Sequence, residues 1–204
     1  MAAALANEPV LLEAFDQGRC PHTEVAAKMT GTTIESVTPE SRFKAKAVNF
    51  GILNGMGAKR LAFELKSDKG TAARFLKDYK RNLPRLNDWM EGVWREAEEF
   101  RVAKTVAGRT RIFTSNEETR PAVSVIVQGS AAELIRHALV AVHDAGLEPL
   151  LTVHDEIIVG GDDPAKAEKL RQTMEAAANG AYPAAFGAVN FLAEATLGRT
   201  WGDA

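Results

Sequence analysis

The fold and the function depend first on the stretch Arg42-Phe-Lys-Ala-Lys-Ala-Val-Asn-Phe-Gly51. Four side chains in and just beyond it recur at intervals of four residues: Arg42, Lys46, Phe50 and Asn54. Because four residues make slightly more than one helical turn, these side chains form a slowly drifting row on one helix face. The cations come first, near the helix end whose free N–H groups also favour anions. The row suits a nucleoside triphosphate, and the alternative is an ordinary amphipathic helix with a solvated basic edge.

Both ends of this predicted helix carry clear signals. Thr38-Pro-Glu40 supplies a capping hydroxyl, a first-turn proline and a first-turn acid, a combination that favours a helix start. Gly55 and Gly57 favour its end. We therefore expect a helix over residues 39–54, with the two cations of the row in its first half.

A second motif, Leu150-Leu-Thr-Val-His-Asp-Glu-Ile-Ile-Val159, lies far downstream. Short apolar runs rich in β-forming residues flank His154, Asp155 and Glu156, so we expect a β-hairpin with a carboxylate pair at its tip. A tight turn of this kind can hold Asp155 rigidly towards a metal ion. The alternative is a solvated acidic turn, which is common in proteins.

The first motif resembles the fingers-helix motif of the family A DNA polymerases, the bacterial polymerase I type and its phage relatives. The shared pattern is Arg-x-x-x-Lys-x-x-x-Phe-Gly with Asn directly before the Phe. The resemblance implies that Arg42 and Lys46 bind the phosphates of an incoming dNTP, with Lys46 also catalytic. It further implies that Phe50 packs on the sugar and base. Asn54 belongs to the same nucleotide site and stands where the family usually has a tyrosine.

The second motif, Val-His-Asp-Glu between apolar strands, resembles the palm motif of the same family. The resemblance implies that Asp155 is one of two carboxylates that hold two Mg²⁺ ions in the complete enzyme. It also implies that Glu156 is catalytic and lies with His154 close to the primer end, where His154 contacts DNA. Such a centre transfers a nucleotide from a dNTP to the primer 3′-hydroxyl.

Shorter matches to the family follow one another in the family's order. Gln128-Gly-Ser-Ala-Ala132 resembles a helix that faces the template–primer duplex, and Thr105-Val-Ala-Gly-Arg109 resembles a segment near the template. The resemblance assigns five residues to DNA binding: Arg109, Arg120, Ser124, Gln128 and His154. His22 stands where a family histidine contacts the triphosphate, and Gly198-Arg-Thr-Trp201 resembles the usual C-terminal pattern. Taken singly, each of these residues also has an ordinary structural explanation.

One part of the family's metal centre has no counterpart here. The other metal-binding Asp of the family lies in a strand with the pattern Asp-Tyr-Ser-Gln-Ile-Glu, which no segment near the N-terminus shows. Met1-Ala-Ala-Ala-Leu5 resembles the residues just after that strand. We therefore expect a C-terminal fingers and palm portion, inactive or nearly so alone, which needs an upstream polypeptide carrying the second Asp. The alternatives are a non-catalytic DNA- or nucleotide-binding module and an inactive truncated product.

The composition agrees with an intracellular protein that binds nucleic acid on one face. The chain has 204 residues, a net charge of −2 and one cysteine, Cys20, which fits a reducing compartment. No apolar run is long enough to cross a bilayer, and no signal segment is visible. We expect the cytoplasm of a bacterial or phage-infected cell and no membrane partner. Residues 41–85 contain twelve Lys and Arg against three Asp and Glu, a local charge of +9, which favours template–primer DNA as a partner.

The spacing of apolar residues predicts an α+β chain that is mostly helical. Expected helices cover residues 1–16 with a break near Pro9, 22–30, 39–54, 56–65, 70–81, 84–102, 120–145 and 164–178. Expected strands form hairpins over 103–114 and 150–159, with a final strand over 189–196. The resemblance divides the chain into a palm element at 1–19, a fingers subdomain at 20–118 and a palm subdomain at 119–204. This palm is incomplete, and its hairpin carries the catalytic Asp.

Overall fold

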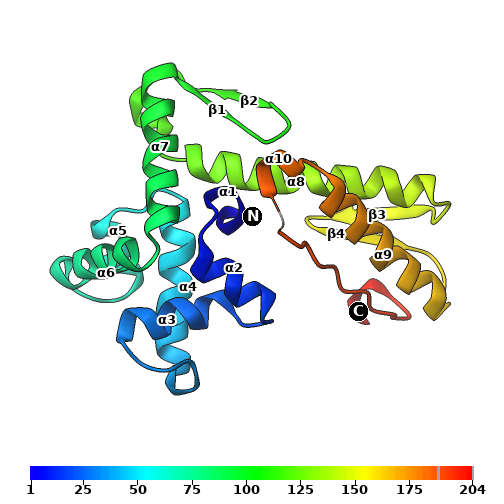
Figure 1. Cartoon of the computed structure of the whole chain (residues 1–204), viewed down its shortest axis with the longest axis horizontal. Coiled ribbons are helices and arrows are strands. Elements are labelled where there is room, and N and C mark those ends of the chain that lie inside the picture. The colour runs from blue at the N-terminus through cyan, green and yellow to red at the C-terminus, as the bar shows by residue number, and fades with distance from the viewer. Residues whose placement is uncertain (188, 204) are drawn as a thin grey trace. The chain divides into compact units, whose positions relative to one another are not determined.

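The computed structural model describes residues 1–187 and 189–203, and the prediction of a mostly helical α+β chain is confirmed (Figure 1). The helices are α1 (Ala2–Ala6), α2 (Pro9–Asp16), α3 (Pro21–Thr30), α4 (Pro39–Leu53), α5 (Ala58–Glu64), α6 (Lys69–Asn82), α7 (Pro84–Phe100), α8 (Ala122–Asp144), α9 (Pro164–Gly180) and α10 (Pro183–Phe186). The strands are β1 (Val102–Lys104), β2 (Thr110–Ile112), β3 (Pro149–Val153) and β4 (Glu156–Val159). Short 3₁₀ turns cover Ile34–Ser36, Asn116–Thr119 and Trp201–Asp203.

The chain divides into two compact units. The first unit contains residues 1–105 and 110–127, and the second contains residues 106–109 and 128–203. These units do not coincide with the predicted fingers and palm, whose boundaries stay a prediction. Helix α8 contributes its first turns to the first unit and the remainder to the second.

The first unit has a continuous core that runs through most of its helices. Its fully buried side chains include Val48, Leu61, Tyr79, Leu86 and Met90. Helix α3 packs against α4, and α5 packs against α6. Burial, with a smaller effect of the Glu8 carboxylate, raises the pKa of the Tyr79 phenol, so this ring stays neutral inside the core.

The structure confirms the predicted start of α4 and places its end close to the predicted one. The Thr38 hydroxyl accepts a hydrogen bond from the Ser41 N–H at 3.2 Å, and Pro39 is the first helical residue. The helix ends at Leu53, one residue before the predicted end. Gly55 follows with a φ of 73°. A Cβ at Gly55 would lie 2.8 Å from the Arg120 carbonyl oxygen, so this turn requires glycine for two reasons.

The second unit surrounds a smaller core, in which Ala138 and Val142 of α8 meet Leu147 and Ile157. The predicted hairpin forms between β3 and β4, which pair antiparallel with Val153 opposite Glu156. The loop between β1 and β2 also belongs to this unit, because the Val106 N–H donates to the Ser130 hydroxyl at 3.1 Å.

The predicted final strand over residues 189–196 is wrong, because these residues form no strand. A strand needs a partner for its backbone groups, and here side chains of α9 take that place. Asn179 accepts from the Phe191 N–H at 2.6 Å and donates to the Phe191 carbonyl at 3.0 Å. Glu175 accepts from the Ala193 N–H at 3.0 Å. The segment therefore lies along a helix rather than in a sheet.

Helix α8 is long and apolar enough to cross a membrane by length and composition alone. The sequence contains no uncharged run of that length, because Glu133 and Arg136 interrupt it. A single helix of this kind among the described residues is weak evidence for a membrane span.

Candidate functional site

Three of the four residues predicted to form a row lie together on the exposed face of α4. Arg42, Lys46 and Phe50 are exposed, and we call these three residues the α4 row. The opposite face buries Ala45, Val48 and Ile52 in the core. The Lys46 ammonium lies 6.0 Å from the centre of the Phe50 ring, at the limit of a cation–π contact. The row therefore presents two cations and an aromatic face to solvent.

Asn54, the fourth predicted member of the row, stabilises the C-terminal end of α4. It is the residue that caps the C-terminus of α4, and its side-chain amide donates to the Phe50 carbonyl at 2.8 Å. It is exposed. Its place in a nucleotide site stays a prediction.

Helix α3 and the residue that precedes it, Cys20, bring two further side chains beside the α4 row. The His22 ring centre lies 5.6 Å from that of Phe50, with the rings tilted by 46°. The Arg42 guanidinium donates to the Cys20 sulfur at 3.5 Å. The resemblance predicts His22 at the triphosphate, and the structure places its ring against Phe50 and within the electrostatic reach of Lys46 and Arg42. Cys20 was not expected there, and nothing in its sequence context indicated Arg42 as its partner.

Electrostatics at this site act on both Cys20 and His22. Burial, followed by the charges of Lys46 and Arg42, lowers the pKa of His22, so its ring is neutral at pH 7. Burial raises the pKa of the Cys20 thiol, but hydrogen bonds from Thr23, Arg42 and the His22 backbone outweigh it and bring the pKa to about 7. The surroundings of the row thus favour negative charge and disfavour another cation, as a polyanion site requires.

The Asp155 hairpin has the predicted tight tip. His154 and Asp155 form the two-residue turn between paired Val153 and Glu156. His154 has a φ of 54°, a left-handed conformation that is uncommon for a residue other than glycine. Both turn side chains are exposed. The Glu156 carboxylate accepts from the Trp201 indole N–H at 3.1 Å, so Trp201 holds one of the two acids in place.

Asp155 is suited to be one ligand of a Mg²⁺ ion, but only one. Its exposed carboxylate offers the hard oxygen ligands that this ion prefers. Among the described residues, no group of three or more His, Cys, Asp and Glu could hold a metal ion. The hairpin therefore fits part of a Mg²⁺ centre, and further ligands would have to come from elsewhere.

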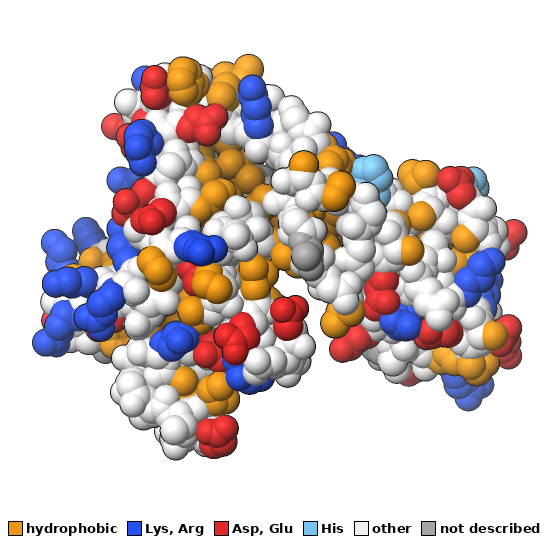
Figure 2. Space-filling view, viewed as in Figure 1, with side chains coloured by type: hydrophobic (Ala, Val, Ile, Leu, Met, Phe, Trp, Pro, Cys, Tyr) orange, Lys and Arg blue, Asp and Glu red, His pale blue; other side chains and the backbone are white. Residues whose placement is uncertain are grey.

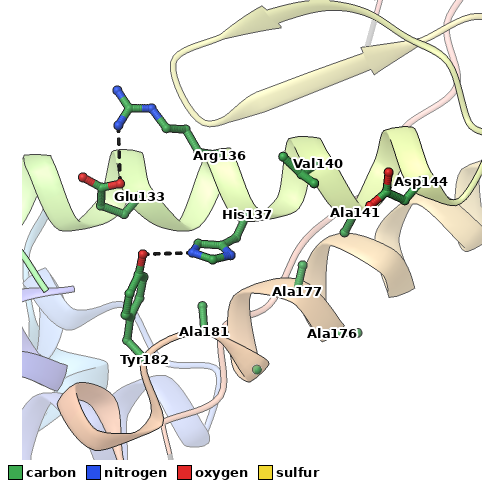
Figure 3. Close-up of a pocket in the computed structure, with 11 residues that line it drawn as sticks. Glu133, Arg136, His137, Val140, Ala141, Asp144, Ala176, Ala177, Ala181 and Tyr182 are labelled. Atoms are coloured by element: carbon green, nitrogen blue, oxygen red, sulfur yellow. Dashed lines mark hydrogen bonds and ion pairs between the residues drawn. The ribbon is translucent and has the colours of Figure 1, made fainter. Parts of the chain in front are cut away.

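Of the residues predicted to contact DNA, Arg109 has the clearest setting. Its guanidinium forms an ion pair with the buried Glu133 carboxylate of α8 at 3.1 Å. Figure 3 shows Glu133 paired also with Arg136, along the edge of a groove of about 670 Å³ between α8 and α9. In the same groove His137 bonds to the Tyr182 hydroxyl at 2.9 Å. No sequence motif singled out Glu133, although it directly follows the Gln128–Ala132 segment that resembles the family.

Three further predicted DNA contacts, Arg120, Ser124 and Gln128, lie at or near the start of α8. Arg120 and Gln128 are exposed, and Ser124 is half-buried. The Arg120 backbone carbonyl accepts from the Trp94 indole N–H at 3.0 Å, which fixes the chain just before the helix. Their contacts with DNA stay a prediction.

The capped helix with its cationic and aromatic row, and the hairpin that exposes an Asp at its turn, are the two motifs that resemble DNA polymerase family A in the sequence. Residues 1–203 match DNA polymerase family A, and the chain belongs to this family. The thermostable DNA polymerase I of Thermus aquaticus is 32% identical over 98% of this chain, and that of Thermus filiformis is 33% identical over 99%. DNA polymerase I of Rhizobium leguminosarum is 31% identical over 99%.

A solved structure shows the same relationship in three dimensions. The polymerase domain of Pol1 from M. smegmatis, in complex with DNA primer-template and dNTP, aligns with a TM-score of 0.78 at 30% identity. The alignment covers 86% of this chain and 34% of that structure. This chain spans about a quarter of the length of the curated relatives that it matches, 25% for the Thermus aquaticus enzyme and 22% for that of Rhizobium leguminosarum.

Proposed function

We propose that this chain is the fingers and palm portion of a template-directed DNA polymerase, which transfers nucleotides from dNTPs to a primer 3′-hydroxyl. The observation that carries the proposal is the α4 row with His22 beside it, two exposed cations and an aromatic ring on one face of a capped helix. Membership of DNA polymerase family A supports it. A relative solved with DNA primer-template and dNTP supports the choice of partners.

Each site residue has a proposed role that follows from the chemistry of its side chain. Arg42 and Lys46 bind the phosphates of the dNTP through charge-assisted hydrogen bonds, and Phe50 packs on its sugar and base. Asn54 lies at the same nucleotide. Arg109, with the exposed residues near the start of α8, contacts the template–primer duplex. His154 and Glu156 lie near the primer end.

Asp155 holds part of the metal centre in this proposal. Asp155 would help to hold divalent ions, whose chemistry there would be to lower the pKa of the primer hydroxyl and to stabilise charge on the leaving pyrophosphate. The second carboxylate comes from a polypeptide segment that precedes these residues in the family, supplied by an upstream polypeptide. Without that segment, residues 1–204 extend a primer slowly or not at all. Bacterial relatives support the cytoplasm of a bacterial or phage-infected cell as the location.

The experiment is primer extension by the chain mixed with an upstream polypeptide that carries the missing Asp strand. We expect Asp155→Ala to abolish extension, because it removes a metal ligand. Lys46→Ala should raise the dNTP concentration needed for half-maximal rate by about tenfold or more, since a charge-assisted contact is lost. Two matched controls should change neither quantity: Asp162→Ala at an exposed loop acid, and Lys44→Ala.

Lys44 is a suitable control because it lies on the same helix but is paired with Glu40 at 2.6 Å. Extension that persists in Asp155→Ala would move the metal centre elsewhere. An equal effect of the Lys44 and Lys46 variants would contradict the assignment of the α4 row. DNA binding without extension in the mixture would instead favour a non-catalytic binding module.

A further inference from the structure

A buried amide connects α4 to His22 of α3. Asn49 lies directly before Phe50, on the side of α4 that faces the core, and only 8% of its surface is exposed. Its side-chain nitrogen Nδ2 lies 2.8 Å from Nδ1 of His22, 27 residues away in the sequence. Its oxygen Oδ1 is buried and has no hydrogen-bond partner in the described residues. Within residues 1–187 and 189–203, the Asn49 side chain therefore makes one hydrogen bond, to this histidine.

That bond decides which ring nitrogen of His22 carries the proton. A neutral imidazole has one N–H and one acceptor nitrogen, and an amide NH₂ group can only donate. When Asn49 donates to Nδ1, that nitrogen must accept, and the proton is on Nε2. In the opposite orientation of the amide, Nδ1 would carry the proton and Nε2 would present a lone pair. A lone pair repels a phosphate oxygen, whereas an N–H binds it.

The charges around His22 make a neutral ring necessary for this arrangement. Arg42 and Lys46 face it from α4, and Phe50 contacts its ring. On its own helix, the Glu24 carboxylate is paired with Arg19 at 3.3 Å, and Cys20 bonds to Arg42. With two cations close by, a third positive charge on His22 is unfavourable. A neutral ring can still donate to an anion, provided that its free nitrogen carries the proton.

We propose that Asn49 is a positioning residue that fixes His22 as the neutral tautomer protonated on Nε2, so that His22 donates a hydrogen bond to a phosphate oxygen of the bound triphosphate. The phosphate part of this inference depends on the proposed function. The tautomer part does not, because it concerns two side chains of the first unit.

Nitrogen NMR of the histidine side chains tests the tautomer in the intact chain. A spectrum of the unaltered protein near pH 7.5 should show an unprotonated Nδ1 and a protonated Nε2 for His22, with His22→Gln identifying the signals. Asn49→Leu, of similar size without the amide, should remove this preference. Asn49→Asp can only accept, so above the pH at which His22 loses its second proton the remaining proton should be on Nδ1. A protonated Nδ1 in the unaltered protein, or an unchanged tautomer in Asn49→Leu, would overturn the proposal.

The dependence of triphosphate affinity on pH tests the consequence. We expect Asn49→Asp to bind a dNTP as well as the unaltered chain at low pH, where His22 is fully protonated. As the pH rises and the ring loses its second proton, Nε2 becomes an acceptor, and the affinity relative to the unaltered chain should fall roughly tenfold. Asn49→Leu adds no charge and should show a smaller loss of affinity, and a loss in Asn49→Asp that is equal at every pH would contradict the proposal. If the unaltered chain binds no dNTP, the proposed function fails, while the NMR result still decides the role of Asn49.

Discussion

A side-chain hydrogen bond between Arg42 and Cys20 joins the α4 row to the start of α3. The thiol is half-buried, and the Arg42 guanidinium is 3.5 Å from its sulfur. Hydrogen bonds from the helix start and from Arg42 together bring its pKa to about 7, against the effect of burial. A thiolate is therefore present in substantial fraction at neutral pH, beside a residue assigned to phosphate binding.

The rate at which iodoacetamide alkylates Cys20 should rise with pH and level off, with a midpoint near 7, because only the thiolate reacts. Arg42→Ala should move this midpoint upwards, since one donor to the thiolate is lost. Lys44→Ala, on the same helix, should leave it unchanged. Cys20 is the single cysteine, so mass spectrometry of the intact chain measures the rate. A midpoint near 8.5 in the unaltered chain, the value of an ordinary thiol, would contradict the lowered pKa, and an unchanged midpoint in Arg42→Ala would show that Arg42 does not contribute to it.

The positions of individual side chains could be predicted from the sequence where a motif repeats at helical spacing. Arg42, Lys46 and Phe50 could be placed on one face because the helix period fixes their relation. His22 was located through the family resemblance alone. Asn49 could not be assigned to His22, because their contact crosses between two helices and depends on packing that no local spacing encodes. The same holds for the ion pair of Glu133 with Arg109.

Among the helices, α2 and α7 share one capping group, the carboxylate of Glu8. Glu8 has no exposed surface. It caps α2 by accepting from the Val10 N–H at 3.3 Å, and it accepts from the Leu86 N–H in the first turn of α7 at 3.1 Å. The cap residue of α7 itself makes no such side-chain bond. Glu8 thus ties the N-terminal helices to α7, 78 residues further along the chain.

Replacing Glu8 by Ala should lower the free energy of unfolding by about 3 kcal/mol, because two helix-start N–H groups lose their acceptor and one of them is buried. Urea unfolding measures the change. Glu13→Ala is the matched control on the same helix, where the carboxylate is exposed and bonds only to Gln17. We expect it to change stability by about 0.5 kcal/mol or less. Equal losses in the two variants would contradict a capping role for Glu8.

The elements themselves could largely be predicted from the sequence. Proline and capping residues marked the starts of α4 and α9, and alternation with a short turn marked the Asp155 hairpin. The error at residues 189–196 has a physical cause. An extended, apolar segment has the composition of a strand, but whether it enters a sheet depends on a partner. Here Asn179 and Glu175 satisfy its backbone instead.

At the scale of the whole molecule, charge is unevenly distributed. The chain carries −2 in total, whereas residues 41–85 carry +9. Figure 2 shows Lys and Arg gathered over α5 and α6. Among them, Lys59, Lys69 and Lys77 are exposed. An acidic protein with such a region binds polyanions locally while it repels them elsewhere, so its affinity for DNA should depend strongly on salt.

We therefore expect the logarithm of the DNA association constant to fall linearly with the logarithm of salt concentration. Each phosphate contact contributes about −0.9 to the slope on duplex DNA. Changing Lys59, Lys69 and Lys77 together to Gln should make the slope shallower by up to about 3. Lys169→Gln on α9 is the control and should leave it unchanged. Fluorescence anisotropy of a labelled primer–template at several salt concentrations measures both, and equal slopes for all variants would exclude the α5 and α6 cations from the interface.

The bond between Trp201 and Glu156 gives the hairpin its own optical label. Trp89 and Trp94, the remaining tryptophans, both lie on α7 in the other compact unit. With those two changed to Phe, all indole emission would come from a ring attached to the acid next to Asp155. Events at the turn, such as the arrival of a divalent ion, would then alter the colour or intensity of that emission, without any dye added to the protein.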